Sequence, residues 1–412
     1  MSKTKLILFG LILIPLIIGL SECLSPKKIP DPRGEEYAGS ASCVSCHKNT
    51  YKSYLHTAHF NSSQLADSSS IQGNFAAGSN ELVFNSHTKV VMDKRKSGSY
   101  QITYHDGKMG ESGRFDIVFG GFKGQTYAYW LGNELFQLPV SYVSNARQWV
   151  NSPGYQNNEP DYERMITSQC LGCHMSYAKV EPGKLPLFVQ NPEGFDRKTI
   201  IYNIDCERCH GPAAQHVKFQ TENPEIKEAK YIATYKSLTK VQKINMCAVC
   251  HSGANNVMVK PTFGFKPGDT LSNYMKIVPS NLSSNYKDID VHGDQAGMLA
   301  TSKCFISSNM SCANCHNTHV DERDNKVLFA ARCMSCHTEN KGHTCKLDDQ
   351  LTPALLTKNC IDCHMPAFAS KLIVAGKSGA MVHTHHIGIY PEEAKQILNY
   401  LRSKNTISAT KR

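Results

Sequence analysis

The chain has 412 residues with a formal net charge of +10, and it contains 17 Cys and 18 His. A basic chain of this kind is a candidate for binding nucleic acid or an acidic membrane surface. It has, however, no lysine-rich tail and no interleaving of aromatic with basic residues, so we expect no nucleic-acid partner.

The N-terminus has the pattern of an export signal. Lys3 and Lys5 precede an apolar run from Leu6 to Leu20, which is too short for a comfortable membrane span. We therefore expect residues 1–22 to be a signal peptide and residues 23–37, rich in Pro, Lys and Glu, to be a tether. The protein is then exported to the periplasm or the outer surface. Cys23 stands where a lipoprotein carries its membrane-anchoring lipid, although Glu22 departs from that signal; a plain cleaved signal or an uncleaved anchor is the alternative.

Seven copies of the pattern Cys-x-x-Cys-His follow along the chain. Their paired cysteines are Cys43 and Cys46, Cys170 and Cys173, Cys206 and Cys209, Cys247 and Cys250, Cys312 and Cys315, Cys333 and Cys336, and Cys360 and Cys363. The His that completes each copy is His47, His174, His210, His251, His316, His337 or His364.

This pattern is typical of c-type haem attachment. The two thiols bind the haem vinyl groups as thioethers, and the adjacent His is the proximal ligand of the iron. Structural zinc does not require a His directly after the second Cys, and a thioredoxin-like redox centre uses one such motif on a βαβ scaffold. The sequence therefore predicts seven covalently attached haem c groups as cofactors. Seven oxidised haems would add a charge of about −7, which offsets much of the basic excess.

The longest interval between motifs, from His47 to His174, has β-like runs at residues 81–84, 89–92, 100–104 and 115–119. The later motifs are closely spaced and leave little room for a core made of protein alone. We expect a mainly α, haem-packed fold with few short helices and long loops, and a small antiparallel β insertion between the first two motifs. The expected divisions are 38–165 for the first motif with the insertion, 166–390 for a six-haem core, and 391–412 for a closing helix and tail.

The residues that the motifs leave over are informative. Cys23, Cys304 and Cys345 remain, and in an oxidising compartment Cys304 and Cys345 are candidates for a disulfide. The 18 His less the seven proximal ones leave 11, an excess that distal ligation of the irons would explain. Met175 and Met365 are alternative ligands, but each directly follows a proximal His and is poorly placed to bind the same iron.

Several segments resemble the family of cytochrome c-554-like multihaem proteins. They are the opening from Tyr37 to His47 with Thr57-Ala-His59, the unit Cys206-Glu-Arg-Cys-His-Gly-Pro-Ala-Ala-Gln-His216, the central segments Phe265–Asp269 and Cys312–His319, and Cys360–Pro366 followed by His385-His386. The likeness extends over most of residues 37–390. It implies a mostly helical fold with close parallel and perpendicular haem pairs, as in relatives of hydroxylamine oxidoreductase.

The resemblance also implies distal ligands. These are His59, His216, His292, His319, His343 and one of His385 or His386, of which we take His386. The seventh is then His56, His87, His105 or His383.

Two classes of function follow. The first is an electron carrier in exported respiratory electron transport, which exchanges electrons with donor and acceptor proteins of unknown identity, either as a free protein or as a subunit of a larger complex. The second is a reductase or oxidase of a small nitrogen or sulfur compound, which needs a five-coordinate haem and proton donors in a pocket. Tyr127, Tyr129, Tyr142 and Arg147 are candidates to line such a pocket, but packing within a β-sheet explains them better, so we assign no catalytic residue.

Overall fold

The computed structural model describes residues 30–155, 159–185, 192–253, 255–278, 291–337, 357–375 and 378–409. The predicted signal peptide, residues 23–29 of the predicted tether, Cys23, His343 and Cys345 lie outside these residues. Within the described part of the chain, no helix is both long enough and apolar enough to cross a membrane.

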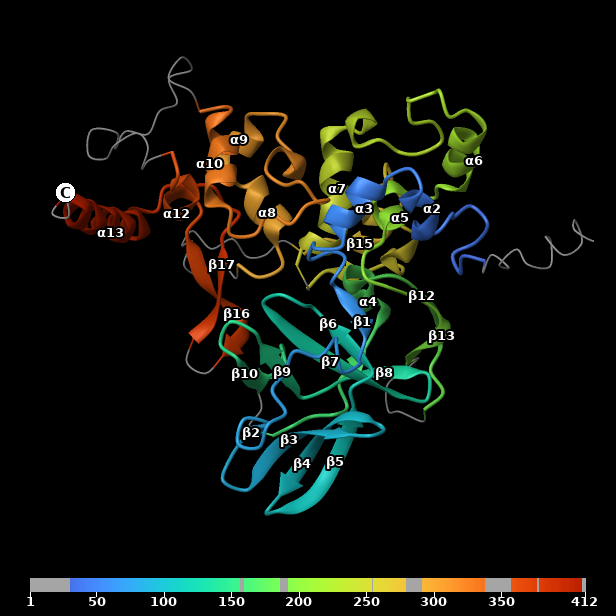
Figure 1. Ribbon diagram of the computed structural model, residues 1–412, viewed down its shortest axis with the longest axis vertical. Helices are drawn as coiled ribbons and strands as arrows, with labels where there is room; N and C mark the ends of the chain where they lie inside the picture. Colours follow the sequence, from blue (N-terminus) through green and yellow to red (C-terminus); the bar gives the residue numbers. More distant parts are fainter. Residues whose placement is uncertain are drawn as a thin grey trace, which may run out of the picture.

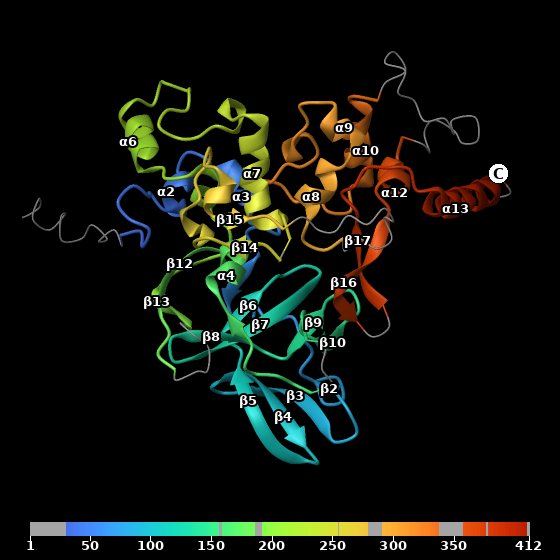
Figure 2. The same cartoon turned by 180° about the vertical axis from the view of Figure 1, so that it is seen from behind.

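The segment between the first and second motifs folds into two antiparallel sheets. A seven-stranded sheet has the order β1-β6-β7-β8-β11, with β9 paired to β7 and β10 paired to β9, and a four-stranded sheet has the order β2-β3-β4-β5. The bounds are β1 Ser63–Leu65, β2 Glu81–Val83, β3 Thr88–Arg95, β4 Gly98–His105, β5 Lys108–Arg114, β6 Ile117–Phe119, β7 Gly124–Leu131, β8 Glu134–Gln137, β9 Val140–Val143, β10 Gln148–Asn151 and β11 Met165–Ile166. Both views place this β region at the end of the molecule opposite to the helices (Figures 1 and 2).

The two sheets share a hydrophobic core. Burial alternates along β3, whose inward residues Val90 and Met92 pack with Tyr127, Leu138 and Trp149 from the larger sheet. This alternation is the period of a strand with one face on a core. Each large apolar side chain buried in this way contributes about 1.5–3 kcal/mol, so the β region has a core made entirely of protein.

The remaining chain combines short helices with three β-hairpins. The helices are α2 Ser40–Val44, α3 Lys48–Tyr54, α4 Ser168–His174, α5 Cys206–His210, α6 Ala214–Glu222, η1 Tyr235–Ser237, α7 Lys240–His251, η2 Thr262–Gly264, η3 Leu271–Asn273, α8 Gln295–Ala300, α9 Lys303–Ile306, η5 Cys312–Asn314, α10 Lys326–Met334, α12 Cys360–His364 and α13 Pro391–Ala409. The hairpin strands are β12 Met175–Pro182 with β13 Glu193–Tyr202, β14 Val257–Met258 with β15 Met275–Lys276, and β16 Ala367–Ala375 with β17 Ser378–His383.

The expectation of a mainly α fold with a small β insertion is wrong. Helix makes up 29% of the structure and strand 26%, and the strands form several antiparallel sheets. The motif helices are short: α2, α5 and α12 have five residues each. The strand β12 directly follows the second motif, β16 begins shortly after the seventh, and β13 before the third contains the run Thr199-Ile-Ile-Tyr202. Such residues favour a pleated, half-buried surface over a helix.

Candidate haem-binding sites

Each of the seven motifs lies on a short helix or at its end. The second, third, fourth and seventh motifs lie entirely within α4, α5, α7 and α12, whereas the first, fifth and sixth cross the end of α2, η5 or α10. Cysteines three residues apart fall on one face of a helix, one turn from each other. This spacing presents both thiols to the edge of one haem and directs the next residue, the His, toward its centre.

The motifs meet one another at their thiols. The thiols lie within interaction range in four pairs: Cys43 with Cys206, Cys173 with Cys250, Cys247 with Cys312 and Cys333 with Cys360. The corresponding elements are also in contact: α2 with α5, α4 with α7, α7 with η5, and α10 with α12. The third motif therefore adjoins the first, the fourth adjoins both the second and the fifth, and the seventh adjoins the sixth.

Three pairs of imidazole rings have a separation that suits an intervening iron; the ring planes are 25° apart in two pairs and 88° apart in the third. The ring centroids lie 5.9 Å apart for His210 and His319, 6.2 Å for His316 and His385, and 6.1 Å for His59 and His251. Two imidazoles bound to one iron at about 2.0 Å on opposite sides have centroids about 6.3 Å apart. Each pair joins one proximal His to a His from elsewhere in the chain, so the donor set fits bis-His haem.

Burial favours the neutral form of these imidazole rings, which is the form that binds a metal. Burial lowers the pKa of His59 and of His385 to about 4, and burial also lowers the pKa of His174, His210, His316 and His319. A neutral imidazole has a free lone pair on one nitrogen, whereas a protonated one has none. These His are therefore ready to bind iron near neutral pH.

Backbone carbonyls orient several other rings. The Nδ1 atom of His216 donates to the carbonyl of Lys230 at 2.8 Å, that of His364 to Gly388 at 2.8 Å, and that of His383 to the carbonyl of Met365. A metal-bound His commonly donates its second ring nitrogen in this way, which leaves Nε2 for the metal.

The other predicted distal ligands differ in how close they lie to a proximal His. His292 lies within electrostatic range of His174, and His216 lies within range of the pair around His210. The ring of His386 contacts Thr301 and the ring of Tyr390. The structure thus places His385, rather than the expected His386, opposite His316.

The four candidates for a seventh ligand are widely spread. His105 lies in β4 and contacts Thr88, and His87 lies between β2 and β3 and contacts Asp106; the four-stranded sheet is far from most motif helices (Figure 1). His56 is exposed, whereas His383 lies beside the seventh motif.

Glu207, between the two cysteines of the third motif, is a buried carboxylate with several hydrogen-bond donors. Glu207 is 3% exposed, and its oxygens accept from the backbone N–H groups of Ala38, Gly39 and Ala213 and from Arg33. The guanidinium of Arg33, itself 4% exposed, also pairs with Asp31 and Asp205. The network binds the segment before the first motif to the third motif. No local pattern in the sequence predicts it, because its members lie far apart in the chain.

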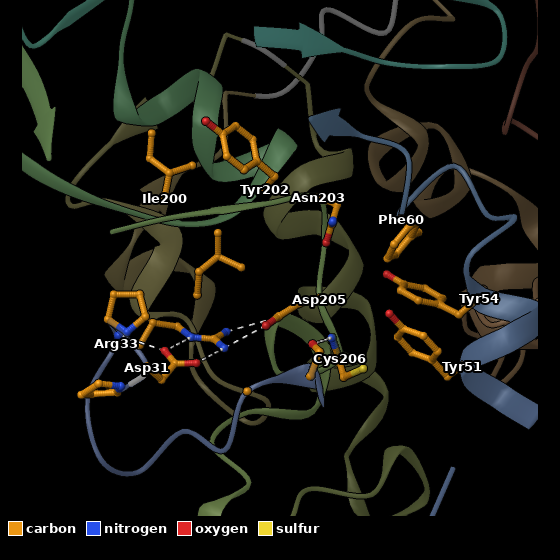
Figure 3. A pocket seen from close by; sticks show the side chains of 15 residues that line it. Asp31, Arg33, Tyr51, Tyr54, Phe60, Ile200, Tyr202, Asn203, Asp205 and Cys206 are labelled. Carbon is orange, nitrogen blue, oxygen red and sulfur yellow. Dashed lines mark hydrogen bonds and ion pairs between the residues drawn. The ribbon is translucent and has the colours of Figure 1, made fainter. Parts of the chain in front are cut away.

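A cavity of about 540 Å³ lies beside this network. Tyr51, Tyr54 and Phe60 line one side, and Arg33 lines the other, with Cys206 of the third motif between them (Figure 3). The Tyr54 hydroxyl donates to the carbonyl of Ile204, and its ring lies 6.3 Å from that of His319. The cavity therefore adjoins the haem site of the third motif.

The residues considered for a catalytic pocket are structural. Tyr127 is fully buried in the core of the β region and donates to Gln125, and Tyr142 packs on Trp149 in the same core. Tyr129 donates to the carbonyl of Tyr162, and Arg147 lies in a turn with a φ of 51°. Met175 is also fully buried in an apolar cluster, so it is not exposed as a ligand.

Comparisons with known proteins find multihaem cytochromes. The family model described as cytochrome c554 and c-prime matches residues 42–107 and 140–211. A multiheme cytochrome MtrA of Shewanella baltica (strain OS185) is 27% identical over 196 residues, which is 45% of this chain and 56% of that protein. The chain thus spans little more than half the length of this relative. The crystal structure of an outer cell wall cytochrome, OcwA, has a TM-score of 0.52 at 17% identity and covers 88% of this chain and 81% of that one, a likeness in fold.

The chain is thus similar to multihaem c-type cytochromes, and these relatives support haem c as its cofactor. The predicted resemblance to cytochrome c-554-like proteins is confirmed, and electron transfer is the general activity that this class suggests.

Proposed function

We propose that this protein transfers electrons through seven covalently bound haems in exported respiratory electron transport. The three facing His pairs carry the proposal, because an iron with two His ligands has no open position for a substrate. Bound haem would supply an iron that gains and loses one electron. The chain holds each group, orients its ligands and keeps neighbouring groups together.

The proposed axial ligands follow from the ring positions. His251 pairs with His59, His210 with His319 and His316 with His385, on the distances given above. We assign His292 to His174 and His216 to His47 by proximity and family resemblance, and His343 to His337 by resemblance alone. For His364 the choice remains between His383 and His386, both of which lie near the seventh motif.

The thiol contacts support a particular order of the sites. The first motif adjoins the third, Cys209 of the third interacts with Cys250 of the fourth, and the fourth also adjoins the second and the fifth. The charge of Cys336 in the sixth motif acts on Cys315 in the fifth, and the sixth adjoins the seventh. The sites then form a branched row with the first, second and seventh motifs at its ends, where donor and acceptor proteins would exchange electrons.

Export and membrane attachment are part of the proposal. The basic and apolar N-terminus supports a signal peptide, and Cys23 is the proposed lipid site. We also propose a disulfide between Cys304 and Cys345, since both are outside the motifs and the compartment would be oxidising. Mass spectra of the mature, unreduced protein test both modifications: a diacylglyceryl group on Cys23 and a Cys304–Cys345 cross-linked peptide are expected.

No specific observation favours a substrate reaction. The cavity at Tyr51 and Tyr54 has hydroxyl groups, but the iron of the adjoining third motif would face His319 and so be closed. A reductase or oxidase would need an open iron at such a cavity.

Spectroscopy of the purified oxidised protein tests the function. We expect seven haems per chain from the absorbance of the alkaline pyridine complex, and low-spin signals from nearly all irons in low-temperature electron paramagnetic resonance. A high-spin signal near one seventh of the haem, together with turnover of nitrite, hydroxylamine or tetrathionate, would replace electron transfer by catalysis as the main activity.

A further inference from the structure

The third motif contains a buried cation with too few partners. Arg208 is 8% exposed, and its Nη2 atom donates to the carbonyl of Gly172 at 3.0 Å and to Oγ1 of Thr262 at 3.3 Å. Its Nε and Nη1 atoms are buried and have no hydrogen-bond partner among the described residues.

Such an arrangement is costly unless an anion completes it. A buried charge normally has a counter-ion, and each buried N–H group without an acceptor destabilises the fold. Arg33 shows the usual solution, with three carboxylates around its guanidinium. Asp205 and Glu207, the acidic residues next to Arg208 in sequence, are engaged by Arg33 instead.

Arg208 lies where three motifs converge. It extends from α5 to the carbonyl of Gly172 in α4, and the Cys250 thiol of α7 donates to that same carbonyl at 3.6 Å.

We propose that Arg208 binds the propionate carboxylate of a haem attached at the second, third or fourth motif and raises the reduction potential there. The proposal rests on haem attachment at these motifs. A propionate is the anion that such a haem brings into the interior, and a guanidinium is the side chain best suited to it. Reduction adds one electron to the iron without breaking a bond, so the site becomes more negative and a nearby cation favours the reduced state.

Two variants separate charge from packing. Arg208→Gln removes the cation, whereas Arg208→Lys keeps it with a different donor geometry. In a potentiometric titration followed by visible absorbance, we expect Arg208→Gln to lower the one-electron reduction constant of at least one haem about tenfold, which is about 59 mV. Arg208→Lys should give a smaller decrease. Arg95→Gln, in an exposed pair with Asp93 in β3, is the control and should leave every potential unchanged.

A second measurement observes the carboxylate itself. We expect the propionate bending bands in resonance Raman spectra to shift in both Arg208 variants and to stay unchanged in Arg95→Gln. Unchanged potentials and unchanged bands in Arg208→Gln would overturn the proposal. An equal decrease of the reduction potential in the Lys and Gln variants would also overturn it. If Arg208→Gln does not mature, Arg208→Lys decides: less than a twofold change in every reduction constant with unchanged bands would leave Arg208 only a structural role.

The outcome is distinct from that of the proposed function. A failure of the Arg208 proposal leaves haem content and low-spin signals as expected for electron transfer. A failure of electron transfer would appear as a high-spin iron in the unmodified protein, whatever Arg208 does.

Discussion

At the scale of single residues, the proposed iron ligands are rings from distant parts of the chain that lie close together. His59 precedes the β region, yet its ring lies opposite that of His251 in α7. His56, one helical turn earlier in sequence, is exposed. Two His with the same local setting therefore have different roles, and only the packing distinguishes them.

His59→Gly should open one iron, whereas His56→Gly should not. The first change removes the ring opposite His251 and leaves a five-coordinate or water-bound iron, so we expect a high-spin signal of about one seventh of the haem. Electron paramagnetic resonance of the oxidised variants measures this fraction. Equal spectra for the two variants would reject the His59–His251 pair.

The neighbouring residues His385 and His386 give a similar test. We expect His385→Gly to produce a high-spin iron at the fifth motif, because His385 faces His316. His386→Gly should leave that iron low-spin, although it removes the contact with Thr301. A magnetic circular dichroism spectrum in the near infrared, which reports bis-His ligation, would show the same difference, and the reverse pattern would favour His386 as the ligand.

Glu207 should be worth more to stability than a surface carboxylate. Glu207→Ala leaves three backbone N–H groups and part of the Arg33 charge without an acceptor, and breaking a buried charge network costs about 3–5 kcal/mol. Glu81→Ala, which removes an exposed pair with Lys89, should cost less than about 1 kcal/mol. The midpoints of urea unfolding compare them, and similar midpoints for the two variants would contradict the role of Glu207.

At the scale of elements, the motif helices pack closely enough to restrict the residues between the two cysteines. Gly172 separates Leu171 from Cys173 in α4, and a Cβ atom at this position would lie 2.2 Å from Oγ1 of Thr262 in η2. The short distance requires Gly, although the motif itself accepts any residue there. The contact places η2 against α4 and brings the carbonyl of Gly172 to Arg208.

Gly172→Ala should destabilise the protein by about 1–3 kcal/mol, the usual cost of overpacking. Thr262→Ala removes the clashing oxygen, and the next atom, Cβ of Thr262, would lie at 3.6 Å, so the double variant should lose less than the sum of the single changes. Gly264→Ala, in the same short helix with its nearest atom at 3.9 Å, is the control. Thermal unfolding followed by circular dichroism gives the comparison, and strict additivity would show that the clash does not occur.

The strands near the motifs were harder to predict than the helices. The β-like runs at 81–84, 89–92, 100–104 and 115–119 coincide with β2, β3, β4 and β6, because each is a short run bounded by Gly, Asn, Ser or Asp. The hairpin β12–β13 was missed, since its register shifts interrupt the alternation of burial along its strands. The expectation of a mainly α fold is therefore wrong, because the strands beside the motifs have no clear sequence pattern.

At the scale of the whole molecule, the four-stranded sheet lies at the end opposite to most motif helices, and α4 lies beside the larger sheet (Figure 2). The β region has its own apolar core. Leu171 of the motif helix α4 packs in a second apolar cluster with Ile117 and Leu135 of the larger sheet. The seventh motif lies at one end of the row, next to α10 and α13.

Removal of the sixth haem should isolate the seventh iron magnetically. In Cys333→Ala/Cys336→Ala we expect six haems per chain, and the seventh iron should lose the line broadening caused by its oxidised neighbour, because α10 and α12 are in contact. Cys43→Ala/Cys46→Ala, at another end of the row, should instead sharpen the signal of the third motif. Electron paramagnetic resonance distinguishes the two, and an unchanged signal of the seventh iron in the first variant would contradict the proposed order.

The sequence by itself determined the chemistry of attachment, because Cys-x-x-Cys-His is a local pattern that needs only one turn of helix to present its three side chains. It also indicated that spare His serve as ligands and pointed to His59 and His319. Only the tertiary structure decided which rings face each other, that His385 lies closer to a proximal ring than His386, and that Arg208 is buried without an acceptor. These features depend on contacts between segments far apart in the chain, and no local pattern encodes the distances that packing sets.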